Sequence, residues 1–204
     1  METRCSACGV SILETTAKET GGTCMPCHRG TRKSIDAARH RRLADKAAIE
    51  ANPSTLLRRA LRDRRSNGLE DEFTDDESVF LLVSDLIEEG GSLGGFFERR
   101  CGEFYQETLE ALIVIGAIEE AEHLRAGRHF YFGNAEIPKD QAVRGQKMRP
   151  LMTGGDPWLH VDEEGARVEE KFWESKGQLS NKLAAFAKRS GLLPANDVDE
   201  ATQH

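Results

Sequence analysis

The most hydrophobic part of the chain, residues 79–116, is predicted to form two apolar helices joined by a glycine-rich corner. Apolar residues recur at helical spacing in VFLLVSDLI and again in FYQETLEALIVIGA, which predicts two helices with one buried face each. On the second helix, the side chains expected on the inner side are Phe104, Tyr105, Leu109, Leu112 and Ile113. The intervening GGSLGG lets the backbone turn tightly before two phenylalanines enter the core. We therefore expect this stretch to form the core of a mainly α-helical domain.

The first of these helices has a clear start and an unusual end. Thr74-Asp-Asp-Glu77 has the sequence of a capping box, in which the threonine hydroxyl accepts from the glutamate amide and the glutamate reaches back. At the other end, Glu88 and Glu89 place negative charge where the helix dipole favours cations. These two carboxylates are either solvated or kept for a purpose other than helix stability.

Further helices are predicted from the same periodicity and from turn residues at their ends. They cover residues 34–51, from about 53 to Asn67-Gly68, 118–126, 138–148 and 178–190. Ser54 is the expected cap of the second of these, Gly127 is expected to end the third, and Pro138 is expected in the first turn of the fourth. The segment HFYF at 129–132 is predicted to be extended and buried.

Four of the five cysteines form two C-x-x-C pairs near the N-terminus. A gap of fifteen residues separates the pairs. Each pair brings two thiolates to one ion from the same turn, and two pairs complete the tetrahedral Cys₄ set that Zn²⁺ prefers. A module of about 30 residues buries too little surface to fold alone, so the metal would supply folding free energy. The sequence therefore predicts one closed, structural zinc site formed by Cys5, Cys8, Cys24 and Cys27.

Two other chemistries could use the same cysteines. Cys24-Met-Pro-Cys27-His28 fits the C-x-x-C-H pattern of haem attachment, but that pattern goes with exported proteins and leaves the first pair unexplained. A redox C-x-x-C pair would need a surrounding βαβ pattern, which this sequence lacks. The fifth cysteine, Cys101, follows two arginines that would favour its thiolate, yet a lone cysteine is more typical of an inert, partly buried thiol.

Charge is distributed unevenly along the 204-residue chain, whose net charge is −7. Residues 28–65 hold twelve basic and four acidic side chains, whereas residues 66–204 hold fourteen and twenty-eight. Five arginines of the basic segment fall on one predicted helix, and they are Arg58, Arg59, Arg62, Arg64 and Arg65. They suit phosphate binding, but no aromatic residue interleaves them for base stacking. The alternatives are direct nucleic-acid contact through residues 29–65, a solvated helical connector, and a connector whose positive face docks on the acidic body of the same or a neighbouring chain.

These patterns divide the chain into four parts. They are a Cys₄ module over 1–30, a basic helical connector over 31–68, an acidic α-helical domain over 69–193 and a disordered tail over 194–204. No segment approaches the run of about 18 apolar residues needed to span a membrane, and the N-terminus lacks an apolar signal region. We therefore expect a cytoplasmic protein with no membrane partner.

Several segments of the acidic domain match one family pattern: Glu88-Glu89, Gly94-Gly95-Phe96-Phe97, EALIVIGA at 110–117, Ile137-Pro-Lys-Asp140, Arg144 and VEEKFW at 168–173. Through these residues the chain resembles the bacterial DNA-mimic protein family over about residues 70–190. Where the family's corner commonly reads Asn-Asn-Gly-Gly-Phe, this chain has Ser92 and Leu93 before Gly94.

The resemblance implies a non-enzymatic α-helical protein that presents carboxylates in a phosphate-like array. Such an array would occupy the nucleic-acid-binding face of a partner, either a transcription factor or a toxin nuclease blocked by an immunity protein. The carboxylates expected to meet the partner are Asp75, Asp76, Glu77, Asp85, Glu88, Glu89, Glu119, Glu120 and Glu122. A homodimer is compatible with this role. The alternative is a zinc-ribbon and arginine-rich protein that binds DNA or RNA directly.

Overall fold

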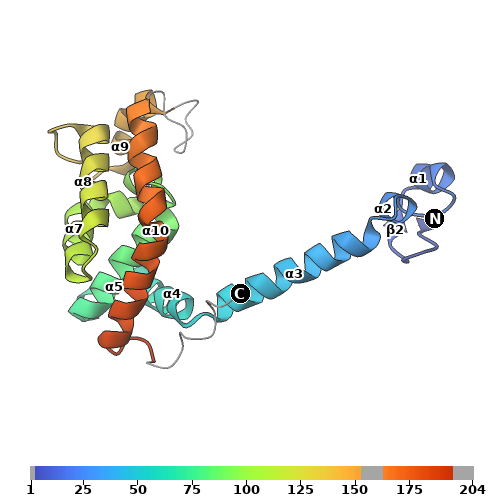
Figure 1. The fold of residues 1–204 in the computed structure, drawn as a ribbon, viewed down its shortest axis with the longest axis horizontal. Helices are drawn as coiled ribbons and strands as arrows, with labels where there is room; N and C mark the ends of the chain where they lie inside the picture. The colour runs from blue at the N-terminus through green and yellow to red at the C-terminus, as the bar shows by residue number, and fades with distance from the viewer. Residues whose placement is uncertain (1–2, 153–162, 195–204) are drawn as a thin grey trace. The chain divides into compact units, whose positions relative to one another are not determined.

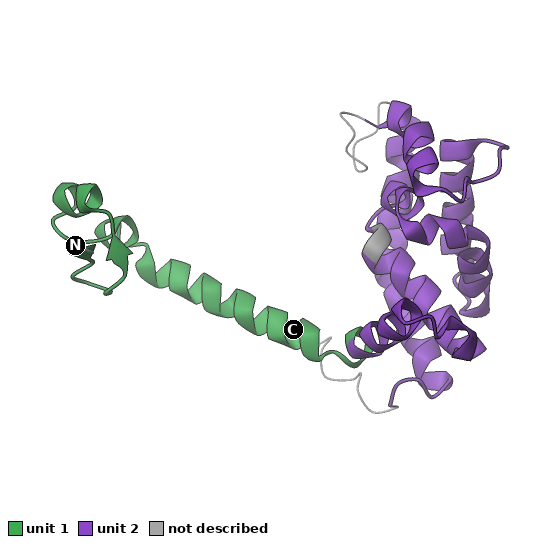
Figure 2. Ribbon diagram, turned by 180° about the vertical axis from the view of Figure 1, so that it is seen from behind, with its two compact units in different colours: residues 1–55 green, residues 56–204 purple. Residues whose placement is uncertain are grey.

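The computed structural model describes residues 3–152 and 163–194, which form ten α-helices and one short hairpin (Figure 1). This confirms the prediction of a mainly α-helical chain with a cysteine cluster at its N-terminus. The chain forms two compact units, residues 1–55 and 56–204, which we call unit 1 and unit 2 (Figure 2). Their boundary falls inside the basic connector predicted over 31–68, so most of its second helix belongs to unit 2. The predicted tail beyond Pro194 lies outside the described residues.

Unit 1 consists of a two-stranded antiparallel hairpin followed by three helices. Its elements are β1 (Thr3–Arg4), β2 (Ser11–Ile12), α1 (Glu14–Glu19), α2 (Met25–His28) and α3 (Arg32–Ala51). Helix α3 has no buried residue. It is rich in alanine, the best helix former, and two ion pairs four residues apart lie along it, Arg32–Asp36 at 2.9 Å and Lys46–Glu50 at 3.8 Å. Interactions within α3, and not packing against other elements, therefore stabilise this helix.

Unit 2 contains the larger core. Its helices are α4 (Pro53–Ser66), α5 (Asp75–Asp85), α6 (Leu93–Glu98), α7 (Tyr105–Val114), α8 (Ile118–Phe132), α9 (Gln141–Met148) and α10 (Glu163–Arg189). Between them lie the 3₁₀ turns η1 (Glu70–Glu72), η3 (Arg100–Phe104) and η4 (Arg149–Leu151), and the π-helical turn η2 (Leu86–Gly90). Helix α10 packs along α8, and α5 packs on α7. No helix of the described residues is long and apolar enough to cross a membrane.

Helix starts follow local capping chemistry. The predicted capping box is present, because the Glu77 N–H donates to Thr74 Oγ1 at 3.1 Å and the Thr74 N–H donates to Glu77 Oε2 at 2.9 Å. At α4, the cap is Asn52 and not Ser54, because the Asn52 side-chain oxygen accepts from the N–H groups of Ser54 and Thr55. The signal for this cap is the asparagine that directly precedes Pro53, the first residue of the helix.

Helix α8 is longer than its sequence pattern predicts. It runs through Gly127 to Phe132, so the HFYF segment predicted as extended is its last turn. A Cβ at Gly127 would lie 3.0 Å from Leu93 Cδ1 and 3.3 Å from Phe97 Cε2. This glycine therefore permits close packing of α8 on α6, and the expectation that it ends the helix was wrong.

Three other expectations are corrected by the structure. Helix α9 starts after Asp140, whose Oδ1 accepts from the Val143 N–H at 2.9 Å, so Pro138 lies ahead of the helix. Helix α10 is 27 residues long and starts well before the predicted residue 178. On α7, Ile113 is 45% exposed instead of facing the core.

The glycine corner becomes the N-terminus of α6 and is fixed by a carboxylate from α10. Glu169 accepts from the backbone N–H groups of Leu93 at 2.9 Å and Gly94 at 2.6 Å, and from the Tyr131 hydroxyl at 2.9 Å. A negative charge is favourable at a helix N-terminus because the first N–H groups have no partner within the helix. Glu169 therefore ties α6, α8 and α10 together.

A buried arginine fixes the other end of α6. Arg144 of α9 is fully buried, and its guanidinium donates to four backbone carbonyls at 2.6–2.8 Å. The acceptors are Phe97, Arg99, Pro138 and Lys139. Burial lowers the pKa of this guanidinium, but an arginine stays protonated in proteins. Arg144 thus joins α9 to the end of α6 through backbone carbonyls.

Candidate metal centre and acidic groove

The four predicted metal ligands come together in unit 1. Cys5 and Cys8 lie at the β1–β2 turn, while Cys24 precedes α2 and Cys27 lies within it. The turn closes through the Gly9 N–H, which donates to the Cys5 carbonyl at 2.8 Å with Gly9 at φ +72°. All four sulfur atoms lie within 4.8 Å of one another.

The sulfur arrangement fits a tetrahedral metal ion. Zinc–sulfur bonds of about 2.3 Å require sulfur atoms about 3.8 Å apart, and Cys8 Sγ lies 3.7 Å from Cys24 Sγ. The Cys24 N–H also donates to Cys5 Sγ at 3.2 Å, a contact that stabilises a ligand thiolate. Unit 1 can therefore bind one metal ion through four sulfur ligands.

The pKa values of Cys5 and Cys27 shift in opposite directions. Burial opposes ionisation of Cys5, but N–H groups of Cys24, Ala7 and Cys8 outweigh it and lower its pKa to about 6. A hydrogen bond with the Cys24 side chain, together with burial, raises the pKa of Cys27 to about 12. Four adjacent thiolates repel one another, so a bound divalent cation would take the place of the protons they retain.

Two of the carboxylates predicted to meet a partner are buried and paired within unit 2. Asp85, with 4% of its side chain exposed, accepts from Arg62 at 2.6 Å and Arg65 at 2.7 Å. Glu120, with 0% exposed, pairs with Lys182 Nζ at 2.7 Å. Removing one partner of a buried pair leaves an uncompensated charge. These two carboxylates therefore join α4 to α5 and α8 to α10.

The remaining predicted carboxylates lie nearer the surface. Glu77 pairs with Arg64 at 2.6 Å, and Glu88, with 57% of its side chain exposed, lies 3.4 Å from Arg58. The side chain of Glu89 lies outside the described part of the structure. The exposed or half-exposed carboxylates with no ion pair to another described element are Asp75, Asp76, Glu119 and Glu122.

The arginines of α4 face the acidic body. Arg58, Arg62, Arg64 and Arg65 each reach a carboxylate of α5 or η2, and Leu61 is 1% exposed on the same helix. For this helix, the geometry favours docking on the acidic body of the same chain over a free phosphate-binding surface.

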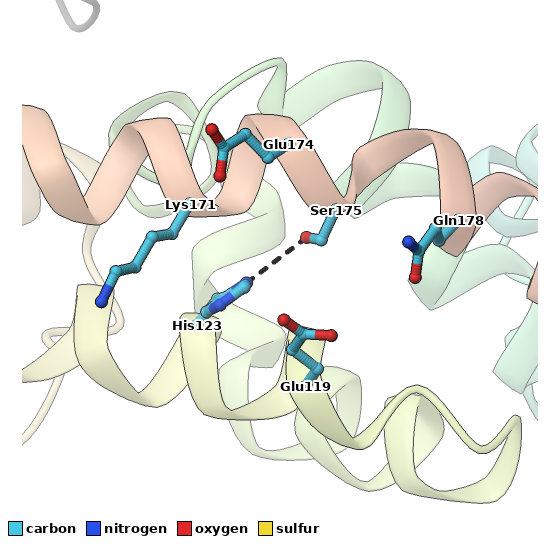
Figure 3. Close-up of a pocket in the computed structure, with 6 residues that line it drawn as sticks. All are labelled: Glu119, His123, Lys171, Glu174, Ser175 and Gln178. Carbon is cyan, nitrogen blue, oxygen red and sulfur yellow. Dashed lines mark hydrogen bonds between the residues drawn. The ribbon is translucent and has the colours of Figure 1, made fainter.

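Acidic side chains from distant parts of the sequence meet along the seam between α8 and α10. Two adjoining cavities, of about 380 and 410 Å³, share His123 and Lys171 and form what we call the α8–α10 groove. Figure 3 shows the six residues that line the first of them. The charged side chains that line it are Glu119, Glu122, His123, Glu164, Arg167, Lys171 and Glu174. Four of them are carboxylates, and all four are exposed. Only two of these carboxylates, Glu119 and Glu122, were identified in the sequence.

The hydroxyl in this groove is already engaged. Ser175 Oγ donates to the Phe172 carbonyl at 2.9 Å and lies 3.3 Å from His123 Nδ1. The serine hydroxyl therefore links His123 of α8 to the backbone of α10.

The comparisons with known proteins concern the acidic region. A family model described as DMP19-like protein matches residues 71–190, more than half of the chain. The chain belongs to the DMP19-like family. Searches of the curated proteins and of the solved structures each found no match.

The DMP19-like region runs from η1 to the residue after α10, so it contains the whole α8–α10 groove. The cysteine cluster and α4 lie outside it. DMP19 is a DNA-mimic family, which agrees with the resemblance found in the sequence and suggests a protein-interaction role. The DMP19-like region here therefore combines the family match with a row of exposed carboxylates.

Proposed function

We propose that unit 2 acts as a DNA mimic that binds the nucleic-acid-binding face of a partner protein. The observation that carries this proposal is the DMP19-like match over the region that holds the acidic groove. Partners of this class include a transcription factor and a toxin nuclease, since both expose cationic surfaces to nucleic acid.

The physical basis is the chemistry of phosphate-binding surfaces. Lysine and arginine side chains placed for phosphates also accept carboxylates, and electrostatic steering speeds the encounter. The carboxylates of the groove are carried by two packed helices, which hold their spacing fixed. Asp85 and Glu120 are buried and paired within unit 2, so they stabilise its packing and are not counted among the carboxylates that would meet a partner.

For unit 1, we propose that the bound ion is Zn²⁺ and that its role is structural. Four cysteine ligands make a closed tetrahedral site, which leaves no position for a substrate or water. Purified protein should contain about one zinc per chain.

Direct contact with nucleic acid through unit 1 is a second candidate. The observation that favours it is that α3 has no buried residue, so Arg39, Arg41 and Arg42 are all exposed. Binding of the full chain to double-stranded DNA that weakens steeply with salt, and weakens further when these arginines become alanine, would support it.

The mimic proposal is tested by charge reversal. The full chain is used to capture partners from native cytosol, alongside a Glu119→Lys/Glu122→Lys variant and a control variant, Glu70→Lys/Glu72→Lys. Both variants change the net charge equally, and all four residues are exposed. We expect recovery of the partner to fall for the groove variant only. Equal recovery with all three proteins would contradict a role for the groove.

A further inference from the structure

We propose that Cys8 is a site of oxidation by peroxides, at which a disulfide forms with Cys24 and the bound metal ion is released. The inference rests on the Cys₄ site proposed for unit 1 and adds a reaction of its ligands. Two observations carry it. Cys8 is exposed while Cys24 is buried, and their sulfur atoms lie only 3.7 Å apart.

Cys8 is the cysteine of the cluster that a dissolved oxidant reaches most easily. It lies in the β1–β2 turn, where residues 6–9 are all exposed. Cys5 and Cys24 are 3% and 5% exposed, and Cys27 is half-buried. The oxidation of a ligand thiolate requires that the oxidant reach its sulfur atom. Attack by a peroxide therefore begins at Cys8.

Cys24 is placed to react with an oxidised Cys8. It directly precedes α2, sixteen residues along the chain, and its burial keeps it from direct attack by a dissolved oxidant. Its sulfur nevertheless lies next to that of Cys8. Cys5, the other buried cysteine, accepts the Cys24 N–H at its sulfur at 3.2 Å. Cys24 is therefore the residue that completes the disulfide.

The reaction has two steps. The Cys8 thiolate attacks one oxygen of the peroxide, the O–O bond breaks, and hydroxide leaves a sulfenic acid on Cys8. The Cys24 thiolate then attacks Cys8 Sγ, so that the S–S bond forms, the S–O bond breaks and a second hydroxide leaves. The two sulfur atoms lose two electrons, which reduce the peroxide, and solvent protons convert both hydroxides to water. Two of the four thiolate ligands are lost, and the ion leaves with them.

The fifth cysteine does not compete for the oxidant. Cys101 lies in unit 2 with 5% of its surface exposed, and its thiol donates to the Phe96 carbonyl at 3.2 Å. A buried thiol in apolar surroundings is inert. Oxidation therefore acts on unit 1 and leaves the core of unit 2 unchanged.

The experiment treats the full-length protein with hydrogen peroxide. A chromogenic chelator reports zinc release, and peptide mass spectrometry with fragmentation, after alkylation of the remaining thiols, identifies the first disulfide. We expect Cys8–Cys24 to form first, at the rate at which zinc is released, and dithiothreitol with added zinc to reverse both changes. Another first disulfide, or oxidation of Cys101 before Cys8, would overturn the proposal.

Histidine substitutions test the separate roles of the cysteines, because zinc also accepts a Cys₃His set. Cys8→His should slow zinc release at least about tenfold, whereas the matched control Cys27→His should still form the Cys8–Cys24 disulfide. In Cys24→His, the sulfenic acid on Cys8 should accumulate and be trapped by dimedone. Zinc release from Cys8→His as fast as from the unaltered protein would contradict the assignment.

The disulfide map of the unaltered protein decides the proposal even where a variant binds no zinc. The zinc content of the untreated protein tests the structural site, and the first disulfide formed tests the oxidation. Failure of this inference is therefore distinguishable from failure of the proposed zinc site.

Discussion

Glu77 combines a local and a tertiary role at the start of α5. Its carboxylate accepts from the Thr74 N–H, and the same side chain pairs with Arg64 of α4. The hydrogen bond from the Thr74 backbone, followed by the Arg64 guanidinium, lowers the pKa of Glu77 although burial opposes this shift. The ionised carboxylate therefore stabilises the fold, and its protonation removes that contribution.

Because the folded-state pKa of Glu77 is lowered, its stabilising effect is present above the usual value of 4.5 and lost as the pH falls through the folded-state pKa. We expect Glu77→Gln to reduce the free energy of unfolding by about 1 kcal/mol at pH 7, with a smaller difference in acid. Urea denaturation at several pH values measures this, with Glu70→Gln as an exposed control. A difference that stays constant down to pH 3 would contradict the assignment.

For individual residues, the sequence predicts local partners well and tertiary partners poorly. The capping box and the Cys₄ set could be predicted because their partners lie close in sequence or repeat a known spacing. Asp85 and Glu120 looked like surface carboxylates because their partners, Arg62 and Lys182, lie 23 and 62 residues away. Nothing in a local pattern predicts such pairs.

Two glycines in secondary-structure elements, Gly102 and Gly177, differ in how closely other atoms pack against them. A Cβ at Gly102 in η3 would lie 2.7 Å from the Phe97 carbonyl oxygen, whereas one at Gly177 in α10 would meet nothing within 4 Å. Gly102 therefore allows the backbones of η3 and α6 to approach closely. Gly177 has no such packing role, and alanine would be a better helix former at this position.

The same substitution should have opposite effects at these two positions. Gly102→Ala forces the backbone of η3 and α6 apart and should destabilise unit 2 by about 1–3 kcal/mol. Gly177→Ala should stabilise it by about 0.5–1 kcal/mol, because alanine loses less backbone entropy in a helix. Thermal and urea unfolding measure both. Equal effects of the two substitutions would contradict this packing.

The first and last residues of the helices were harder to predict than the presence of the helices. Helix α10 was predicted only from residue 178, although Val168, Phe172 and Leu179 already continue the helical spacing of its apolar face. Because its first half was missed, Glu164 and Glu174 were not recognised as part of an acidic surface. The groove itself depends on α8 packing against α10, which no local pattern contains.

For the whole molecule, the metal ligands all lie in unit 1, and the acidic groove lies in unit 2. A structural zinc contributes about 10–16 kcal/mol of binding free energy to the folding of a small module. Removing the metal should therefore unfold the cysteine module and leave the helical unit intact.

Calorimetry with and without a strong chelator tests this separation. We expect the transition of unit 2 to keep its midpoint when the metal is removed. Cys8→Ser should reduce the zinc content, whereas Cys101→Ala, outside the cluster, should not. Loss of both units on chelation would show that the metal supports the whole chain.

The central claim is that the acidic surface of unit 2 competes with nucleic acid for one face of a partner. Its most direct test is a displacement experiment with the captured partner bound to labelled DNA, followed by fluorescence anisotropy as the full chain is added. We predict complete release of the DNA at saturating concentrations of the full chain. A ternary complex in which the DNA stays bound at saturating protein would contradict the claim.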